Sequence, residues 1–264
     1  MLSPIVMFLP AHNEAATVAD VVGRAPAEVG GHPVEIVVVD DGSSDATAEV
    51  ARAAGATVHS LGRNRGLGAA VREGLRLGVE RGAVAVVFLD ADGEYAPDEL
   101  ATVVGPILQG HADYVVGSRF AGLPRAMRPH RWLGNRVLTG LVRTLVRRWG
   151  VRTLTDGQSG YRALSADAAA HAEVIHDFNY AQVLTLDLLA KGFRYAEVPI
   201  SYRFRQHGES FIRLGTYLRR VLPAIRRELR SPADRRGRSV LDHEAAEAVA
   251  GRPPASGVEG AVGV

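Results

Sequence analysis

Short apolar runs alternate with amphipathic segments through the first 118 residues of the chain. The apolar runs are β-branched or wholly apolar, as expected of strands that are buried on both faces of a sheet. They cover Ile5–Leu9, Ile36–Val39, Ala83–Leu89 and Tyr114–Val116. Between them, apolar residues recur every three or four positions, which predicts helices over Glu14–Arg24, Asp45–Ala54, Gly66–Arg81 and Pro97–Leu108. Strands that alternate with helices form βαβ units, so we predict an α/β fold with a mostly parallel central sheet flanked by helices.

Polar residues stand where the predicted helices begin. Asn13 is placed to cap the first helix, and Ser43 or Ser44 the second, because their side-chain oxygens accept amide protons that otherwise have no partner. Pro97 suits the first turn of the fourth helix, where its missing N–H costs little. These residues indicate the start of three of the four helices.

Beyond Gly117 the pattern changes to two amphipathic, arginine-rich segments, Asn135–Trp149 and Phe211–Leu229. Their apolar faces suit either packing against the sheet or lying in the plane of a membrane interface, and the sequence leaves both open. From Ser231 the chain turns to Pro, Gly, Ala and charged residues with little periodicity. We therefore expect one domain over residues 1–230 and a disordered tail over 231–264.

The composition narrows the class of protein. The 264 residues include no cysteine, which excludes a disulfide framework, a thiolate metal site and a cysteine nucleophile. No apolar run approaches the roughly 18 residues of a spanning helix, and no basic stretch precedes an apolar core as in a signal peptide. We therefore expect a cytoplasmic protein.

Charge is distributed unevenly along the chain. Residues 1–118 hold 7 Arg and 16 acidic residues, whereas residues 119–238 hold 22 Arg and Lys191 against 9 acidic residues. An acidic half beside a basic half suits a metal or sugar site that faces an anionic partner such as a phosphate, a lipid headgroup or a nucleic acid.

Polar motifs follow the predicted strands at the edge where ligands bind in open α/β sheets. They are Pro10–Glu14, Asp40–Asp45, Asp90–Gly93 and Gly117–Arg119. Asp90 and Asp92 can face one divalent cation, and Mg²⁺ or Mn²⁺ held in this way also binds substrate phosphates. The alternative is that the two acids only cap the following helix. An EF-hand is excluded, because Tyr95 and Ala101 occupy positions that require Gly and Glu.

Three further segments have both a structural and a functional interpretation. Asp40 and Asp41 form either a strand-to-helix turn or a site for the ribose hydroxyls or base of a nucleotide. The loop Gly62–Gly68 is either a helix entry or a means of bringing Arg63 and a helix N-terminus to a diphosphate, and it lacks the third glycine of a dinucleotide fingerprint. The loop Thr155–Ala163 is either a turn capped by Asp156 or a rim where Arg162 meets a phosphate or sugar.

Taken together, these motifs resemble family 2 glycosyltransferases of the GT-A (Rossmann-like) fold, in the dolichol-phosphate mannose synthase-like branch that acts on polyprenyl phosphates. The matching residues run in unbroken order over about residues 4–215: Pro10–Glu14, Val39–Asp45, Asn64–Gly74, Asp90–Asp92, Gly117–Arg119, Ser159–Arg162, Glu197–Ile200 and Gly208–Ser210. Gln158–Arg162 departs from the Thr-Gly-Ser-Phe-Arg form associated with the mannose enzymes, so the resemblance leaves the sugar open.

The resemblance implies an inverting, metal-dependent hexosyltransferase that uses a GDP- or UDP-linked donor. It implies that the nucleotide pocket is lined by Pro10, Ala11, Glu14 and Asp41, and we expect the further candidates Asp40, Arg63 and Ala91 to bind the nucleotide sugar with them. It also implies that Asp90 and Asp92 hold Mg²⁺ or Mn²⁺, and that Asp92, Arg119 and Arg162 are catalytic, with the two arginines meeting phosphates of the donor or acceptor. The metal then stabilises the charge that develops on the departing nucleoside diphosphate.

The acceptor decides whether a general base is needed. A hydroxyl acceptor must lose a proton as it attacks, and Asp177 and Asp187 are the later carboxylates considered for that role. A lipid phosphate is already anionic and suits the arginine-rich half of the chain. We therefore expect a polyprenyl phosphate acceptor and peripheral contact with the cytoplasmic face of a membrane.

Other functions are compatible with part of the sequence. One is a glycosyltransferase that uses a hydroxyl acceptor in polysaccharide or secondary-metabolite synthesis. A nucleotidyltransferase would carry a Gly-rich N-terminal signature, which Ser3–His12 lacks. A nucleic-acid binder would leave the acidic edge unexplained and would need aromatic residues among the basic ones, so nucleic acid is not expected as a partner. The oligomeric state is not indicated.

Overall fold

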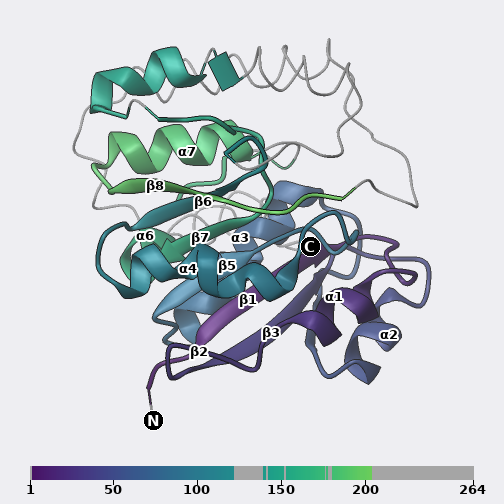
Figure 1. Ribbon diagram of the computed structural model, residues 1–264. Coiled ribbons are helices and arrows are strands. Elements are labelled where there is room, and N and C mark those ends of the chain that lie inside the picture. Colours follow the sequence, from purple (N-terminus) through teal and green to yellow (C-terminus); the bar gives the residue numbers. More distant parts are fainter. Residues whose placement is uncertain are drawn as a thin grey trace, which may run out of the picture.

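A computed structural model describes residues 2–121, 139–140, 142–151, 153–175, 177 and 180–203 of the chain. Its centre is one mixed sheet with the strand order β2-β3-β1-β5-β7-β6-β8, and β4 pairs with β3 beside this path (Figure 1). The strands are β1 (Ile5–Ala11), β2 (Glu28–Val29), β3 (His32–Asp40), β4 (Thr57–Ser60), β5 (Ala85–Phe88), β6 (Tyr114–Ser118), β7 (Arg162–Ser165) and β8 (Tyr195–Pro199).

Helices cover both faces of the sheet. They are α1 (Val18–Arg24), α2 (Thr47–Ala53), α3 (Leu67–Glu80), α4 (Leu100–Leu108), α6 (Ala166–His171) and α7 (Ala181–Ala190), with 3₁₀ turns η1 (Pro97–Glu99) and η2 (Arg147–Trp149). Alternate residues of β1 enter two separate cores, one with α1, α2 and α4 and the other with α3, α6 and α7. The strands are therefore buried on both faces, as their apolar composition predicts.

The four predicted strands are confirmed, and the pairings β1–β3, β1–β5 and β6–β8 are parallel. Strand β7 is the exception in the centre of the sheet, since it lies antiparallel to both β5 and β6. Because β7 runs in the opposite direction, the loop that precedes it arrives at the edge where β5 and β6 end. This insertion brings the second half of the chain to the candidate site.

The predicted helix caps are wrong. Helices α1 and α2 begin later than expected, after Thr17 and Ala46, and neither has a side-chain cap. Asn13 instead takes a left-handed conformation (φ 57°), donates its backbone N–H to Ser43 Oγ and accepts from the Ser44 N–H through Oδ1. Asn13 thus joins the loop after β1 to Ser43 and Ser44 in the loop after β3.

The described part of the Asn135–Trp149 segment packs against the domain. Its apolar residues Val142 and Val146 are buried with Leu186 and Leu189 of α7, and this helix lies along α7 in Figure 1. This apolar face is therefore packed within the domain, as in the first of the two interpretations, but mainly against helix α7 and less against the sheet. Phe211–Leu229 and the tail 231–264 lie outside the described residues. Within the described part of the chain, no helix is long and apolar enough to cross a membrane.

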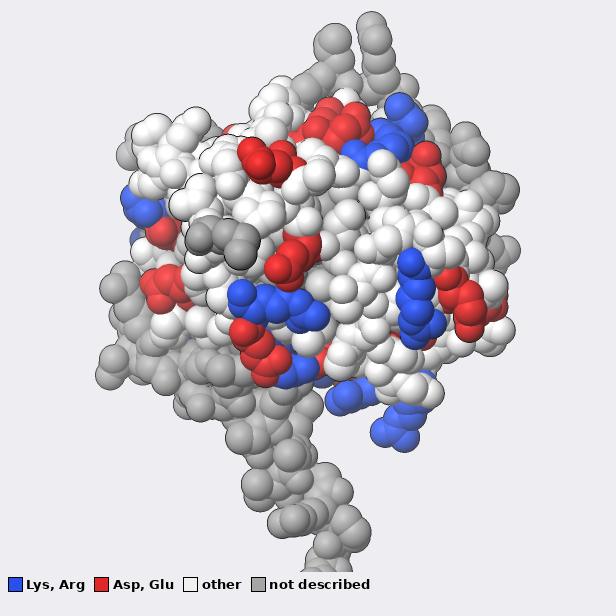
Figure 2. All heavy atoms as spheres, turned by 90° about the horizontal axis from the view of Figure 1, so that it is seen from below, with Lys and Arg blue, Asp and Glu red and all other residues white. Residues whose placement is uncertain are grey.

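The surface of the described residues carries both signs of charge. Figure 2 views the molecule from below, and on that face acidic and basic side chains are interspersed among uncharged ones. Many of the arginines behind the charge asymmetry, such as those of Phe211–Leu229, fall outside the described residues. The described part of this face has no continuous patch of one sign.

Candidate functional site

The loops that carry the predicted motifs meet at the carboxyl edge of the sheet. Ala11 at the end of β1 pairs in register with Asp40 at the end of β3. The Asp90–Asp92 segment follows β5, and Arg119 follows β6. The antiparallel register of β7 sets Arg162 opposite Phe88 of β5, so the loop before it joins the same edge. The predicted convergence is confirmed.

Asp40 and Asp41 are both buried and both bind the surrounding loops. Asp40 accepts from the Ser43 N–H at 3.0 Å and from the Ser60 hydroxyl at 3.1 Å. Asp41 accepts from the N–H groups of Arg65 (2.6 Å) and Gly66 (2.8 Å), which open helix α3. These bonds give the two carboxylates a structural role in shaping the loops at this edge of the sheet.

The loop Gly62–Gly66 is held close to the turn after β3. Gly42 has a φ of 67°, and a Cβ there would lie 2.3 Å from the carbonyl carbon of Arg63, so this close approach requires glycine. Asn64 Nδ2 lies 3.2 Å from His12 Nε2. The Arg63 side chain is exposed at the edge of the site, where it can reach an anionic ligand.

The loop after β1 meets the Asp90–Asp92 loop after β5. Four predicted binding residues line this junction: Pro10, Ala11, Glu14 and Ala91. Pro10 and Ala11 are buried at the end of β1. The Thr17 hydroxyl donates to the Ala91 carbonyl at 2.8 Å and lies 3.2 Å from Glu14 Oε2. A single threonine therefore links two of the predicted nucleotide-binding segments.

Asp90 and Asp92 lie on the loop after β5, and both are partly exposed. Asp92 Oδ1 accepts from the Glu94 N–H at 3.0 Å. The Gly160 backbone passes so close that a Cβ there would lie 2.6 Å from Asp90 Oδ2. The described residues hold no cluster of three or more His, Asp or Glu side chains suited to a metal. Two carboxylates still fit Mg²⁺ or Mn²⁺, since such ions retain water and bind substrate phosphates.

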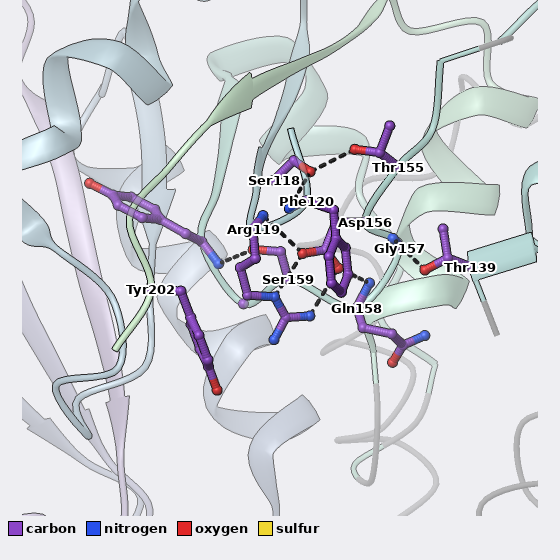
Figure 3. A network of polar contacts seen from close by, with 12 residues as sticks. Ser118, Arg119, Phe120, Thr139, Thr155, Asp156, Gly157, Gln158, Ser159 and Tyr202 are labelled. Atoms are coloured by element: carbon purple, nitrogen blue, oxygen red, sulfur yellow. Dashed lines mark hydrogen bonds and ion pairs between the residues drawn. The ribbon is translucent and has the colours of Figure 1, made fainter. Parts of the chain in front are cut away.

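Arg119 forms a two-pronged ion pair with Asp156, which is fully buried (Figure 3). Its Nε and Nη2 donate to the carboxylate at 2.7 and 2.9 Å, and its backbone N–H donates at 3.1 Å. Burial alone lowers the pKa of Arg119, but Tyr95 and Asp156 outweigh it and raise the pKa, so the guanidinium stays charged. Its remaining N–H groups make no hydrogen bond to the described residues and are available to a phosphate.

Glu197 of β8 holds the loop that carries Asp156. Its carboxylate accepts from the backbone N–H groups of Thr155 (2.8 Å) and Asp156 (3.1 Å) and from the Tyr195 hydroxyl (2.7 Å). Asp156 also accepts from the Gln158 N–H at 3.1 Å, the turn-capping role that the sequence predicts. The ion pair is thus fixed from the far strand of the sheet.

Arg162 does not meet the surface. Its side chain is fully buried, Nε donates to the Ser159 carbonyl (2.8 Å), and its Nη atoms bond Tyr114, Thr185 and the carbonyls of Gly157 and Ala181. The phosphate contact predicted for Arg162 is therefore not what the structure shows, because every direction from the guanidinium is filled by protein. Arg162 instead joins the loop before β7 to α7.

The two carboxylates considered as general bases are both engaged elsewhere. Asp187 is fully buried and pairs with Lys191 at 2.8 Å. Asp177 is exposed and pairs with Arg72, and its carbonyl oxygen accepts from the Gly68 N–H at 2.9 Å. Neither is shown facing the Asp90–Asp92 loop.

Sequence reasoning gave no ion-pair role to Asp156 and overlooked Tyr202. Asp156 lies 37 residues from Arg119, and no spacing rule joins the two. Tyr202 follows β8 and contacts both Arg119 and Glu94. Both residues lie beside a motif that the sequence had already pointed to: the acidic Asp156 shortly before Gln158–Arg162, and the aromatic Tyr202 shortly after Glu197–Ile200. This proximity was the available signal.

Comparison with known proteins places this site in a family context. A protein-family model described as glycosyl transferase family 2 matches residues 7–168. The chain is 33% identical over 224 residues to an undecaprenyl-phosphate mannosyltransferase of Micrococcus luteus, covering 78% of this chain and 86% of that protein. It is 32% identical over 218 residues to a polyprenol monophosphomannose synthase of Mycolicibacterium smegmatis, covering 78% and 79%.

Solved structures confirm the GT-A fold predicted from the sequence. Glucosyl-3-phosphoglycerate synthase of Mycobacterium tuberculosis, solved with Mn²⁺, uridine diphosphate and phosphoglyceric acid, matches with a TM-score of 0.65. The match covers 88% of this chain and 80% of that one at 23% identity. At that identity the likeness concerns the fold.

Proposed function

Because this chain belongs to glycosyl transferase family 2, we propose that it transfers a hexose from a nucleoside-diphosphate sugar to a polyprenyl phosphate. One observation carries the proposal: three features meet at one edge of the sheet. They are the buried ends of β1 and β3, the carboxylates Asp90 and Asp92, and Arg119, which Asp156 holds in place. The names of the relatives, which specify undecaprenyl phosphate and polyprenol, support the choice of acceptor.

The order of the strands separates a donor side from an acceptor side. The donor's nucleotide lies over the ends of β1 and β3, with Pro10, Ala11, Asp40 and Asp41. The Asp90–Asp92 loop follows β5, and Arg119 follows β6, two strands further across the sheet. Arg119 therefore lies on the far side of the carboxylates from the nucleotide, where it donates to the phosphate of the acceptor.

The reaction is an in-line displacement at the anomeric carbon. An oxygen of the acceptor phosphate forms a bond to that carbon, and the bond to the donor diphosphate breaks with its electron pair leaving on the nucleoside diphosphate. A phosphate is already ionised near neutral pH, so no side chain has to remove a proton. The engagement of Asp177 with Arg72 and of Asp187 with Lys191 agrees with this.

Asp90 and Asp92 would hold a divalent cation, Mg²⁺ or Mn²⁺, through their carboxylate oxygens. When bound, the cation neutralises the charge of the donor diphosphate. The protein's own part is to fix the carboxylates, and the close approach of Gly160 to Asp90 Oδ2 limits where that carboxylate can point.

A lipid acceptor requires the protein to reach a membrane surface. The apolar face of the helix around Val142 and Val146 is packed inside the domain, so we place the contact elsewhere. We propose peripheral binding at the cytoplasmic face of the membrane through the other basic segment, Phe211–Leu229. Sedimentation with vesicles that contain anionic lipid measures it.

The decisive experiment combines purified protein, Mn²⁺ or Mg²⁺, a short polyprenyl phosphate and a panel of GDP- and UDP-linked hexoses. We expect lipid-linked sugar and nucleoside diphosphate in equal amounts with one donor, and loss of both on chelation of the metal. The variant Asp92→Ala should lower the rate by about 10³-fold, since several kcal/mol of charge stabilisation are lost.

The matched control is Asp98→Ala, because Asp98 is an exposed carboxylate in η1, shortly after Asp92, and pairs with Arg24 of α1. It should keep the rate within a factor of two. Nucleoside diphosphate release without a lipid product would replace the proposed acceptor by water or a hydroxyl compound. Absence of turnover with every donor, from folded protein, would reject the proposed function.

A further inference from the structure

The segment after β8 crosses directly over the carboxylate loop. Tyr202 forms an antiparallel bridge with Tyr95, and the Arg203 N–H donates to the Glu94 carbonyl at 2.9 Å. The Ser201 N–H donates to Glu99 Oε2 at 2.8 Å. Three consecutive residues therefore fix this crossing to the segment that follows Asp92.

Tyr202 contacts both Glu94, which follows the Asp90–Asp92 loop, and Arg119, the residue proposed to bind the phosphate. Its hydroxyl donates to Glu94 Oε2 at 2.8 Å. Its ring centroid lies 5.2 Å from the Arg119 guanidinium carbon, within the range of a cation–π contact. The ring of Tyr95 meets it edge-on, with centroids 5.7 Å apart, and the Tyr95 hydroxyl accepts from the Gly160 N–H at 2.7 Å.

These contacts leave the Arg119 guanidinium little freedom. Asp156 fixes one edge of the group through Nε and Nη2, and Tyr202 lies on the side away from Asp156 in Figure 3. The edge that remains is the one that can receive a phosphate. Removing Asp156 would leave a nearly buried charge without its counter-ion, whereas removing the ring removes only an orienting contact.

We propose that Tyr202 is a positioning residue that orients Arg119 toward the acceptor phosphate and ties it to the Asp90–Asp92 loop. The inference rests on the proposed function, since it assigns Tyr202 to the acceptor side of that same site. It makes the residues Ser201–Arg203, directly after β8, a part of the active site as well as of the fold. The ring, more than the hydroxyl, carries the effect, because only the ring contacts Arg119.

Two substitutions separate the ring from the hydroxyl. Tyr202→Phe keeps the ring over Arg119 and loses the bond to Glu94, whereas Tyr202→Leu loses both. We expect Tyr202→Leu to raise the KM for polyprenyl phosphate at least tenfold while the KM for the nucleotide sugar stays within twofold. Tyr202→Phe should keep both KM values within about twofold of the wild type.

A double variant tests whether Tyr202 acts through Arg119. If it does, adding Tyr202→Leu to Arg119→Gln raises the acceptor KM no further. A general loosening of the fold would instead raise the KM of both substrates and add to the effect of Arg119→Gln. Binding of uridine or guanosine diphosphate with Mn²⁺, followed as a shift in Tm, shows that each variant keeps the donor side.

The outcomes distinguish this inference from the proposed function. The inference is overturned if Tyr202→Leu matches the wild type, if it affects donor and acceptor alike, or if Tyr202→Phe is as impaired as Tyr202→Leu. Farnesyl phosphate serves as a soluble probe of the acceptor side. A wild-type protein that neither turns over polyprenyl phosphate nor binds farnesyl phosphate overturns both proposals.

Discussion

Buried carboxylates on the two sides of the sheet are satisfied by different partners. On the β1–β3 side, Asp40 and Asp41 accept from backbone N–H groups and a serine hydroxyl. On the β6–β8 side, Asp156 pairs with Arg119, and Asp187 with Lys191. The first arrangement shapes loops. The second pairs opposite charges inside the fold, across 37 residues for Arg119 and Asp156 but only from i to i+4 for Asp187 and Lys191.

The difference has energetic consequences. A carboxylate capped by N–H groups uses charge-assisted bonds to a backbone that would otherwise lack partners. A buried ion pair must offset the desolvation of two charges, so the loss of one partner costs more than the pair contributes. We therefore expect the β6–β8 side to respond more strongly to loss of a charge and the β1–β3 side to respond more locally.

The largest effect is expected at Lys191, whose ammonium group pairs with Asp187 and Glu173 and is almost fully buried. Lys191→Met removes the ammonium group from beside two buried carboxylates and should lower the free energy of unfolding by about 3–5 kcal/mol. Urea denaturation measures this loss. Adding Glu173→Gln and Asp187→Asn should restore part of it. A loss below about 1 kcal/mol in the single variant would remove the contrast between the two sides.

Next in size is an effect on catalysis at Gly160. Its backbone φ is not in the left-handed region, so Gly160→Ala strains no dihedral angle, but its Cβ would lie 2.6 Å from Asp90 Oδ2. The carboxylate must move, and a displacement of about 1 Å should lower kcat by about 100-fold. Gly157→Ala, in the same loop, meets its neighbours at 3.6 Å or more and is the matched control. Equal rates for the two variants would show that the position of Asp90 is unimportant.

On the β1–β3 side, Asp41→Asn is expected to have a smaller effect. The amide keeps one acceptor oxygen but turns an NH₂ group toward the N–H of Arg65 or Gly66. We expect a loss of about 1–3 kcal/mol in the free energy of unfolding, accompanied by a higher KM for the nucleotide sugar. Thermal denaturation and donor kinetics measure the two. Asp20→Asn, at an exposed position of α1, should change neither, and a full-sized loss there would argue against a specific role for Asp41.

The smallest effect concerns acid stability through Asp45. Burial tends to raise the pKa of this carboxyl, but hydrogen bonds from Thr47 and Ala15 outweigh it and lower the pKa. Because the pKa of Asp45 is lower in the folded than in the unfolded state, its ionised carboxyl stabilises the fold at any pH above the unfolded-state pKa of about 3.9. This stabilisation is lost as the pH falls through the folded-state pKa. The stability difference between wild type and Asp45→Asn should therefore be present at pH 7 and shrink below about pH 4. A difference that is constant with pH would contradict this.

Much of the β1–β3 side could be predicted because its signals are local. Apolar runs identified β1, β3, β5 and β6, and the parallel arrangement followed from their alternation with helices. Strand β4 (Thr57–Ser60) gave no such signal, since two of its residues are exposed and it contains Thr, His and Ser. The contacts between Asn13 and Ser43 were also missed, because they depend on the register of β1 with β3 and not on helix rules.

The β6–β8 side could not be derived in the same way. Strand β7 contains Arg162, whose burial depends on acceptors as far away in sequence as Tyr114 and Thr185. A charged residue in a short segment is more typical of a surface, which explains the phosphate contact predicted for it. The pairing of Arg119 with Asp156 follows from the insertion of β7 between β5 and β6, and local periodicity does not predict that insertion.

Lys191 is also the chain's only lysine, and its amine is enclosed by Asp187, Glu173 and the His171 carbonyl. An acylating reagent such as an N-hydroxysuccinimide ester must reach the amine, and these partners enclose it in the folded state. The rate at which such a reagent modifies Lys191 therefore measures how often its contacts with Asp187, Glu173 and His171 open. Apart from the α-amine at the N-terminus, Lys191 is the one amine in the chain. Mass spectrometry can separate the two modified peptides, so the modification of Lys191 measures local unfolding without an engineered probe.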